Sequence, residues 1–217
     1  MSEVSAEQVR DLRAKTGAGM MDCKKALSES GGNFDKAIEL LRKKGLKNVD
    51  KRADKIAAEG IIYSYIHGGG RIGVMLEMNS ETDFVARGDD FQALAKDIAM
   101  HIAWSKPTYV SREQISNDVI EKEKEIYMSQ LKPEDQAKAD RIIPGKIEKF
   151  FQEVCLLDQL DVKDSSGKKK IKDQIQELSA KVGEKIEVRR FSRYEVGEGI
   201  EKPVTDYAAE VKAAMAV

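Results

Sequence analysis

Cysteine, proline, histidine and tryptophan are all scarce in this chain of 217 residues, which has two, four, two and one of them. Cys23 and Cys155 lie far apart in the sequence, so neither a disulfide framework nor a metal-binding motif is indicated. Each is expected to be a small buried apolar residue in a reducing compartment. A chain of this length can bury a sizeable core without either device.

An excess of charge of one sign is also missing. Lys and Arg number 37 and Asp and Glu 38, which gives a net charge of -1. This balance argues against general electrostatic capture of nucleic acid or of an anionic membrane. No signal peptide opens the sequence, and no apolar run approaches membrane-spanning length. We therefore expect a cytoplasmic protein that binds neither a membrane nor nucleic acid directly.

The common catalytic signatures are missing as well. The sequence has no H-E-x-x-H, G-x-S-x-G or Walker motif, and its only histidines are His67 and His101. Its carboxylates stand in charged alternations, as between Glu121 and Glu125, where a shifted pKa is not expected. The glycine-rich turn at residues 17–19 follows no strand and lacks the lysine of a phosphate-binding loop. We expect no enzyme, no metal, no cofactor and no bound nucleotide.

Residues 1–45 predict a module of three short helices, similar to a ubiquitin-associated module. Ser5 and Asn33 are suitable N-caps, and Gly45 is expected to end the third helix. Residues 46–60, which are rich in lysine and arginine, predict a linker helix. Met20 and Met21 are adjacent helix positions that point about 100° apart, so both can hardly be core. Flexible methionine side chains suit an exposed contact surface.

Residues 61–196 predict an α+β core. Alternating apolar residues predict an antiparallel hairpin that turns at residues 67–70, and a third strand over residues 186–196 can pair with it. Helical periodicity predicts helices that cover this small sheet. Ser111 has the spacing of a capping box, and Pro133 and Pro144 each suit the first turn of a helix. Residues 197–217 predict a detached C-terminal helical module.

The stretch from Met78 to Arg87 joins a strand pattern to a helix pattern, and it places an acid beside a large aromatic at that junction. Two interpretations of Phe84 are open. It can fold back as a plug on the core, which the residue type alone favours, or it can be an anchor that the turn, with Asp83 beside it, presents to a partner. The sequence therefore predicts a binding protein with three surfaces for a partner: the N-terminal module with its methionines, this turn, and the detached tail.

Four ordered motifs resemble the bacterial elongation factor Ts family, the guanine-nucleotide exchange factors of elongation factor Tu. The resemblance is carried by residues 12–27, 77–86, 99–103 and 191–202. It implies that the aromatic matching Phe84 enters the GTPase near its nucleotide pocket and that the acid matching Asp83 assists, so Thr82, Asp83, Phe84 and Val85 are the first site residues. Displacing the Mg²⁺ site then weakens GDP binding, and GTP rebinding releases the factor.

The same resemblance implies further contacts with elongation factor Tu. Arg13, Met20 and Met21 are expected to grip a helix of the GTPase domain, and Val211 in the tail helix is expected to add contact there. His67, at the hairpin turn, is expected to face the third domain of the GTPase, which is a weaker assignment.

Longer members of the family carry two core subdomains and an inserted coiled coil, whereas this chain resembles the short form with one copy. If both faces of the partner are still contacted, two copies are needed, which predicts a symmetric homodimer that binds two GTPases. Ser192 stands where some short members have a cysteine at the dimer contact, so the dimer is expected to be non-covalent.

Two other classes of function remain as alternatives. In an adaptor, residues 1–45 would bind some other protein and the core would only support them, so deleting these residues would abolish all binding. In an RNA-binding translation protein, a basic face such as residues 168–170 would dominate and binding would fall steeply with salt.

Overall fold

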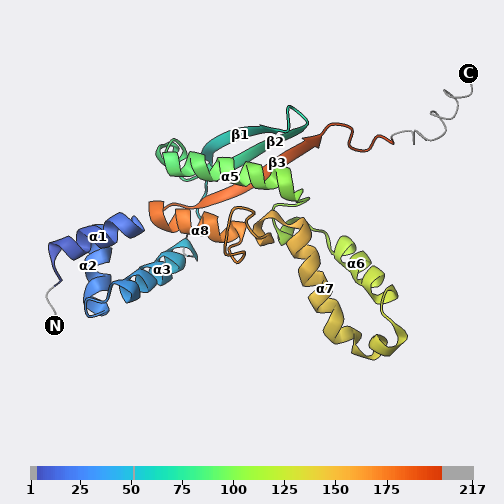
Figure 1. The fold of residues 1–217 in the computed structure, drawn as a ribbon, viewed down its shortest axis with the longest axis horizontal. Helices are drawn as coiled ribbons and strands as arrows, with labels where there is room; N and C mark the ends of the chain where they lie inside the picture. Colours follow the sequence, from blue (N-terminus) through green and yellow to red (C-terminus); the bar gives the residue numbers. More distant parts are fainter. Residues whose placement is uncertain (1–3, 51, 202–217) are drawn as a thin grey trace, which may run out of the picture.

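The computed structural model describes residues 4–50 and 52–201 (Figure 1). A group of three helices lies at one end, a three-stranded sheet with two long helices occupies the middle, and a pair of antiparallel helices projects from it. The predicted α+β class is confirmed. Among the described residues, the structure has no helix that is long and apolar enough to span a membrane.

The N-terminal helices are α1 (Ala6–Thr16), α2 (Met20–Glu29) and α3 (Phe34–Asp50). Ser5 caps α1 through a capping box with Gln8, and the Asn33 side chain accepts a hydrogen bond from the Lys36 N–H at 2.9 Å, as predicted. The three helices enclose a small core of their own, made of Val9, Leu12, Cys23, Ala26, Leu27 and Ala37.

The prediction that Gly45 ends the third helix is wrong, because α3 continues to Asp50. One glycine lowers helix propensity by about 1 kcal/mol, which packing can outweigh. Here α3 packs against α8 (Ile171–Val182). The predicted linker helix is also corrected, since residues 46–50 belong to α3 and residues 52–58 form a turn and irregular structure. The division into units at residues 45, 60 and 196 stays a prediction.

The sheet has the order β1-β2-β3 and is antiparallel throughout, with strands β1 (Glu59–His67), β2 (Ile72–Ser80) and β3 (Ile186–Glu195). This confirms the predicted hairpin and its pairing with the third strand. Alternate residues of β2 are buried, namely Val74, Leu76 and Met78. The opposite face of the sheet carries several exposed apolar side chains.

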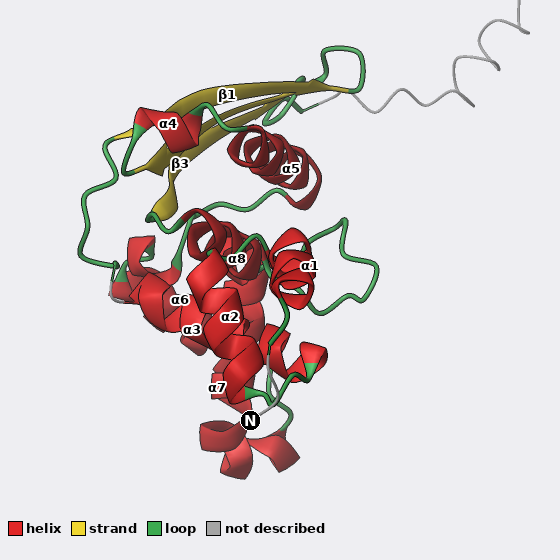
Figure 2. Cartoon of the chain, turned by 90° about the vertical axis from the view of Figure 1, so that its left-hand side faces the viewer, coloured by secondary structure: helices red, strands yellow, loops and turns green. Residues whose placement is uncertain are grey.

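Two helices cover the buried face. Helix α5 (Asp89–Ser105) packs against β1 and β2, and α8 packs against α5 and β3. Figure 2 shows the sheet as an outer layer, with α5 beside it and α8 beyond α5. The apolar side chains of this core include Phe91, Ile98, Ile102, Leu156 and Ile171, all of which are almost completely buried. Gly183 ends α8 in the left-handed conformation, as predicted.

The projecting helices are α6 (Asn117–Ser129) and α7 (Ala139–Val154), joined by the 3-10 helix η2 (Pro133–Lys138). Ser111 caps only the 3-10 turn η1 (Arg112–Gln114), without a side-chain hydrogen bond, so the predicted capping box is wrong. Pro133 begins η2 as predicted, but Pro144 lies inside α7. A proline in a helix interior removes the hydrogen bond to the carbonyl four residues earlier and crowds that carbonyl, which costs about 3 kcal/mol. Here the packing of α7 against α6 outweighs that cost.

Arg112 fixes the base of this helical pair to the core. Its guanidinium group donates hydrogen bonds to Asp158, in the 3-10 helix η3 (Leu156–Asp158), at 2.7 and 2.8 Å. It also donates to Glu148 of α7 at 2.6 and 2.9 Å and lies 4.7 Å from the centre of the Phe151 ring. Hydrogen bonding to Asp158 and then to Glu148 raises the pKa of Arg112, which stays charged.

Candidate functional site

The predicted turn at residues 82–85 folds into a single helical turn, α4 (Asp83–Ala86), after the end of β2. The Thr82 side chain caps it, since its oxygen accepts a hydrogen bond from the Val85 N–H at 3.5 Å. Val85 packs against the core and Ala86 is buried, so the turn is seated by its last two residues. Phe84 points away from the core and is 85% exposed. The interpretation of Phe84 as a core plug is therefore wrong.

Two carboxylates hold this turn in place. Glu184, which follows α8, accepts hydrogen bonds from the Thr82 N–H at 3.0 Å and from the Thr82 hydroxyl at 2.7 Å. Glu81 accepts a hydrogen bond from the Lys185 N–H at 2.7 Å and from Arg52 at 3.0 Å. The bond from the Lys185 N–H and the contact with Arg52 hold the pKa of Glu81 below its ordinary value, so its carboxylate stays charged.

Sequence reasoning missed this support. Glu184 lies 102 positions from Thr82. The two meet because α8 ends at Gly183 beside the junction of β2 and α4, and no spacing in the sequence predicts that meeting. The one available signal was the position of Glu184 between a helix end and a strand, where loop residues often carry contacts between elements.

Asp83 is exposed and forms a salt bridge with Arg87 at 2.9 Å, one helical turn later. Both side chains are largely in water, so this pair contributes roughly 0.3–0.5 kcal/mol. A partner with a cation can therefore displace Arg87 from Asp83 at little cost. Phe84 and Asp83 thus stand together at the surface, one apolar and one charged.

The second candidate surface lies at the start of α2. Met20 and Met21 are 55% and 76% exposed, so neither belongs to the core, which agrees with the expectation that both can hardly be core. Arg13, in the last turn of α1, is exposed as well. Helix α2 begins at Met20, and its N-cap residue Gly19 supplies no side-chain hydrogen bond to the first N–H groups of the helix.

The structure brings some of the predicted site residues together and separates others. Helix α4 lies at the end of the sheet nearer to α1–α3, whereas the turn between β1 and β2, which begins after His67, lies at the other end of the sheet (Figure 1). His67 is exposed, and its Nδ1 atom lies 3.0 Å from the Tyr65 hydroxyl. Val211 and the predicted tail helix lie outside the described residues.

His101 and the two cysteines are buried away from these surfaces. His101 Nε2 lies 2.9 Å from Gln159 Oε1, and burial lowers the pKa of the imidazole. Burial raises the pKa of the Cys155 thiol to about 11, and Cys23 lies in the core of the N-terminal helices. Within residues 4–50 and 52–201, no group of three or more potential metal ligands is found.

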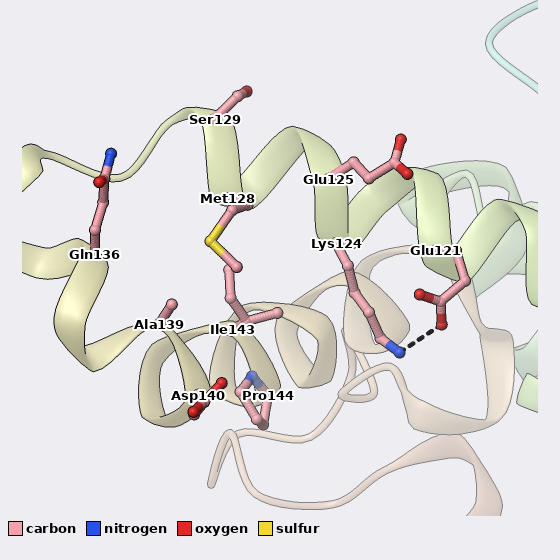
Figure 3. Close-up of a pocket in the computed structure, with 10 residues that line it drawn as sticks. All are labelled: Glu121, Lys124, Glu125, Met128, Ser129, Gln136, Ala139, Asp140, Ile143 and Pro144. Carbon is pink, nitrogen blue, oxygen red and sulfur yellow. Dashed lines mark hydrogen bonds and ion pairs between the residues drawn. The ribbon is translucent and has the colours of Figure 1, made fainter.

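An open groove of about 730 Å³ lies between α6 and α7 (Figure 3). Met128 and Ile143 approach each other across it, and Lys124 pairs with Glu121 at its rim at 2.7 Å. None of the predicted site residues lines this groove. The candidate site is therefore formed by projecting side chains and not by a cavity.

These features define the class of protein. It is an α+β protein that presents exposed apolar side chains on two surface segments, α4 and the start of α2.

The comparisons with known proteins give the family. The family model described as elongation factor TS matches residues 4–168. The chain is 58% identical to elongation factor Ts of Desulforamulus reducens over 98% of both chains, and 55% identical to that of Desulfitobacterium hafniense over 97% of both. It is 53% identical to that of Geobacter metallireducens, over 97% of this chain and 98% of the relative. The chain belongs to the elongation factor Ts family.

Proposed function

We propose that this protein is a guanine-nucleotide exchange factor that binds elongation factor Tu in the cytoplasm and promotes GDP release, without a nucleotide or cofactor of its own. The observation that supports this most directly is the exposure of Phe84 on a turn that Glu184 and the core hold rigidly. An exposed aromatic on a fixed support loses little conformational entropy on binding, so it suits insertion into a partner.

In the proposed mechanism, Phe84 enters the GTPase near its nucleotide site, Asp83 contacts it beside that point, and Thr82 and Val85 hold the turn. The insertion disturbs the Mg²⁺ that bridges the phosphates. Because this ion neutralises phosphate charge, its displacement weakens GDP binding without breaking a covalent bond. Coupling between the two ligands is reciprocal, so GTP rebinding weakens the contact with the factor and releases it.

The start of α2 supplies the second contact. Arg13, Met20 and Met21 are each exposed, and flexible apolar side chains with a positive charge on the neighbouring helix suit the face of a GTPase helix. We also propose weaker contacts at His67 and at Val211.

The test is the release rate of a fluorescent GDP analogue from elongation factor Tu. We expect the wild type to accelerate release and the Phe84→Ala variant to do so at least tenfold less while it still binds. Trp104→Ala is a matched control, because Trp104 is an aromatic that is 77% exposed at the far end of α5. If all three proteins accelerate release equally, Phe84 is not the residue that promotes GDP release. If none of them does, the exchange-factor proposal fails and the adaptor alternative replaces it.

We further propose a non-covalent homodimer formed by the outer face of the sheet, which gives a two-plus-two complex with the GTPase. Ile62, Ile66, Met75 and Tyr194 are exposed on this face. Met75 is paired with Ser192 on the neighbouring strand, so Ser192 lies among them. A second copy suits this face because two identical apolar faces can cover each other around a twofold axis.

Oxidation of a Ser192→Cys variant tests the dimer. We expect it to form a covalent dimer at low concentration, while Ser165→Cys, in an exposed loop, stays monomeric on a denaturing gel. Met75→Glu should dissociate the dimer in sedimentation velocity, because it places two negative charges in the apolar contact. A monomeric wild type would contradict this proposal.

A further inference from the structure

Gly45 lies within α3, at a point where that helix packs against α8. A Cβ atom added at Gly45 would lie 2.9 Å from the Cβ of Ala180, which is closer than two carbon atoms pack. Glycine in a helix interior is less favourable than alanine, because it loses more backbone conformational freedom on folding. Glycine therefore lowers the helix propensity of α3 at this point, but it allows close contact between the N-terminal helices and the core.

The other contacts across this junction combine ion pairs with apolar side chains, since Ile38 and Leu41 of α3 line the crevice between the two parts together with Leu94 and Leu178. Arg42 of α3 lies 3.6 Å from Glu177 of α8, with both side chains largely exposed. Gly17, at the end of α1, lies against the side chain of Lys181, which in turn pairs with Asp90 of α5 at 2.7 Å. A crevice of about 630 Å³ runs between the two parts. Exposed ion pairs contribute little, so the packing of α3 against α8, which is tight at Gly45, determines the position of the N-terminal helices.

A second link joins the same two parts. After α3, the chain reaches the sheet through residues 52–58, and Arg52 in this segment donates a hydrogen bond to Glu81, one residue before the cap of α4. The start of α2 and the α4 turn are thus held relative to each other from two sides, by the contact of Gly45 with Ala180 and by the contact of Arg52 with Glu81.

We propose that Gly45 is a positioning residue for partner binding. This inference rests on the proposed function, in which Met20 and Met21 grip the GTPase while Phe84 enters it. The contact of Gly45 with Ala180 fixes the separation of these two surfaces before the partner arrives. A preorganised pair of contacts binds more tightly than the same contacts on a mobile tether, because the fraction of molecules in the competent arrangement is larger.

The test uses a pair of substitutions that oppose each other. Gly45→Ala adds one methyl group, which the contact cannot hold without moving the helices apart. Ala180→Gly removes the methyl group that it meets. We expect Gly45→Ala to raise the concentration of factor that gives half-maximal GDP release by about tenfold, with the maximal rate unchanged. The Gly45→Ala, Ala180→Gly double variant should restore the wild-type value.

A distance measurement reports the position of the N-terminal helices relative to the core, and it does not depend on the GTPase. Spin labels at Lys25→Cys in α2 and Lys96→Cys in α5 occupy exposed positions, and the native cysteines are buried. Double electron–electron resonance should give one narrow distance in the wild type, a broad distribution in Gly45→Ala and a narrow one again in the double variant. Circular dichroism checks that each variant is folded.

Two results would overturn the inference: a Gly45→Ala variant with wild-type distances and kinetics, or a defect that Ala180→Gly does not repair. If the wild type failed to accelerate GDP release at all, the proposed function would fall, and the positioning role in partner binding with it. The distance measurement would still tell whether the two residues set the arrangement of the two parts, so the two failures can be distinguished.

Discussion

The carboxylate of Glu184 is the main support of the α4 turn, and its removal tests whether the fixed position of Phe84 matters. Glu184 accepts two hydrogen bonds from Thr82, at 3.0 and 2.7 Å. Hydrogen bonds to a charged group contribute roughly 1.5–3 kcal/mol each when buried, and these two are exposed to solvent. We therefore expect Glu184→Ala to destabilise the local arrangement of the turn by about 1–2 kcal/mol, since water replaces part of what is lost.

That loss should appear as a kinetic defect. A free-energy cost of about 1.4 kcal/mol lowers the ratio of competent to relaxed turn tenfold, so the population of the competent turn falls by up to that factor. We expect Glu184→Ala to lower the second-order rate constant of GDP release by up to about tenfold in a stopped-flow assay with a fluorescent GDP analogue. Overall stability should change by less than about 1 kcal/mol, because the pair is exposed.

The controls separate the turn from the rest of the site. Glu184→Gln keeps an oxygen that can accept a hydrogen bond and should lose less than Glu184→Ala. Thr82→Ala removes the hydroxyl bond to Glu184 and the cap of α4 but keeps the backbone N–H bond, so the double variant should lose less than the sum of the two single variants, because they share one contact. Full additivity of the two changes, or unchanged kinetics in Glu184→Ala, would refute the role of this contact in holding Phe84.

Other parts of the structure give predictions about stability. Arg112→Ala leaves the buried carboxylate of Asp158 without its guanidinium partner, and urea denaturation at pH 7 should show a loss of about 3 kcal/mol. Burial raises the pKa of Asp158, but Arg112 outweighs this and holds that pKa below its ordinary value. The stability that the pair contributes is therefore present above about pH 4 and is lost as the pH falls. The difference in unfolding free energy between the wild type and Arg112→Ala should shrink at about pH 4 and below. Burial lowers the pKa of His101, so the unfolded chain binds more protons, and stability should fall as the pH drops below about 6.5, with a smaller slope in His101→Asn. Gly60→Ala should lower the melting temperature markedly, because Gly60 has φ +149° and an added Cβ would lie 2.2 Å from the Met78 carbonyl oxygen.

Much of the fold could be predicted because local signals and tertiary structure agree. The alternation of Val74, Leu76 and Met78 predicts a strand with one buried face, and the structure buries these three side chains. Ser5 and Gly183 mark helix ends through hydrogen bonds and backbone geometry that need only neighbouring residues. Such features are encoded within a few positions of the chain.

The errors fall where a distant element decides the outcome. Gly45 has the identity of a helix terminator, yet α3 continues through it because α8 lies against that point. Pro144 has the identity of a helix start, yet α7 begins five residues earlier, at Ala139, which is buried between the projecting helices. In both cases packing contributes more to the free energy of the helix than the intrinsic propensity of the single residue does.

Phe84 shows why the site was harder to predict than the fold. A single helical turn has only a few positions, and whichever residues reach the core leave the others outside. Val85 and Ala86 take the inward positions, so the largest apolar residue of the turn is displaced to the surface. Residue type alone favours burial of phenylalanine, because burying such a side chain gains about 1.5–3 kcal/mol. A turn that forgoes this gain in the free protein keeps it available for a partner, and Glu184 keeps the turn from relaxing so as to bury Phe84 itself.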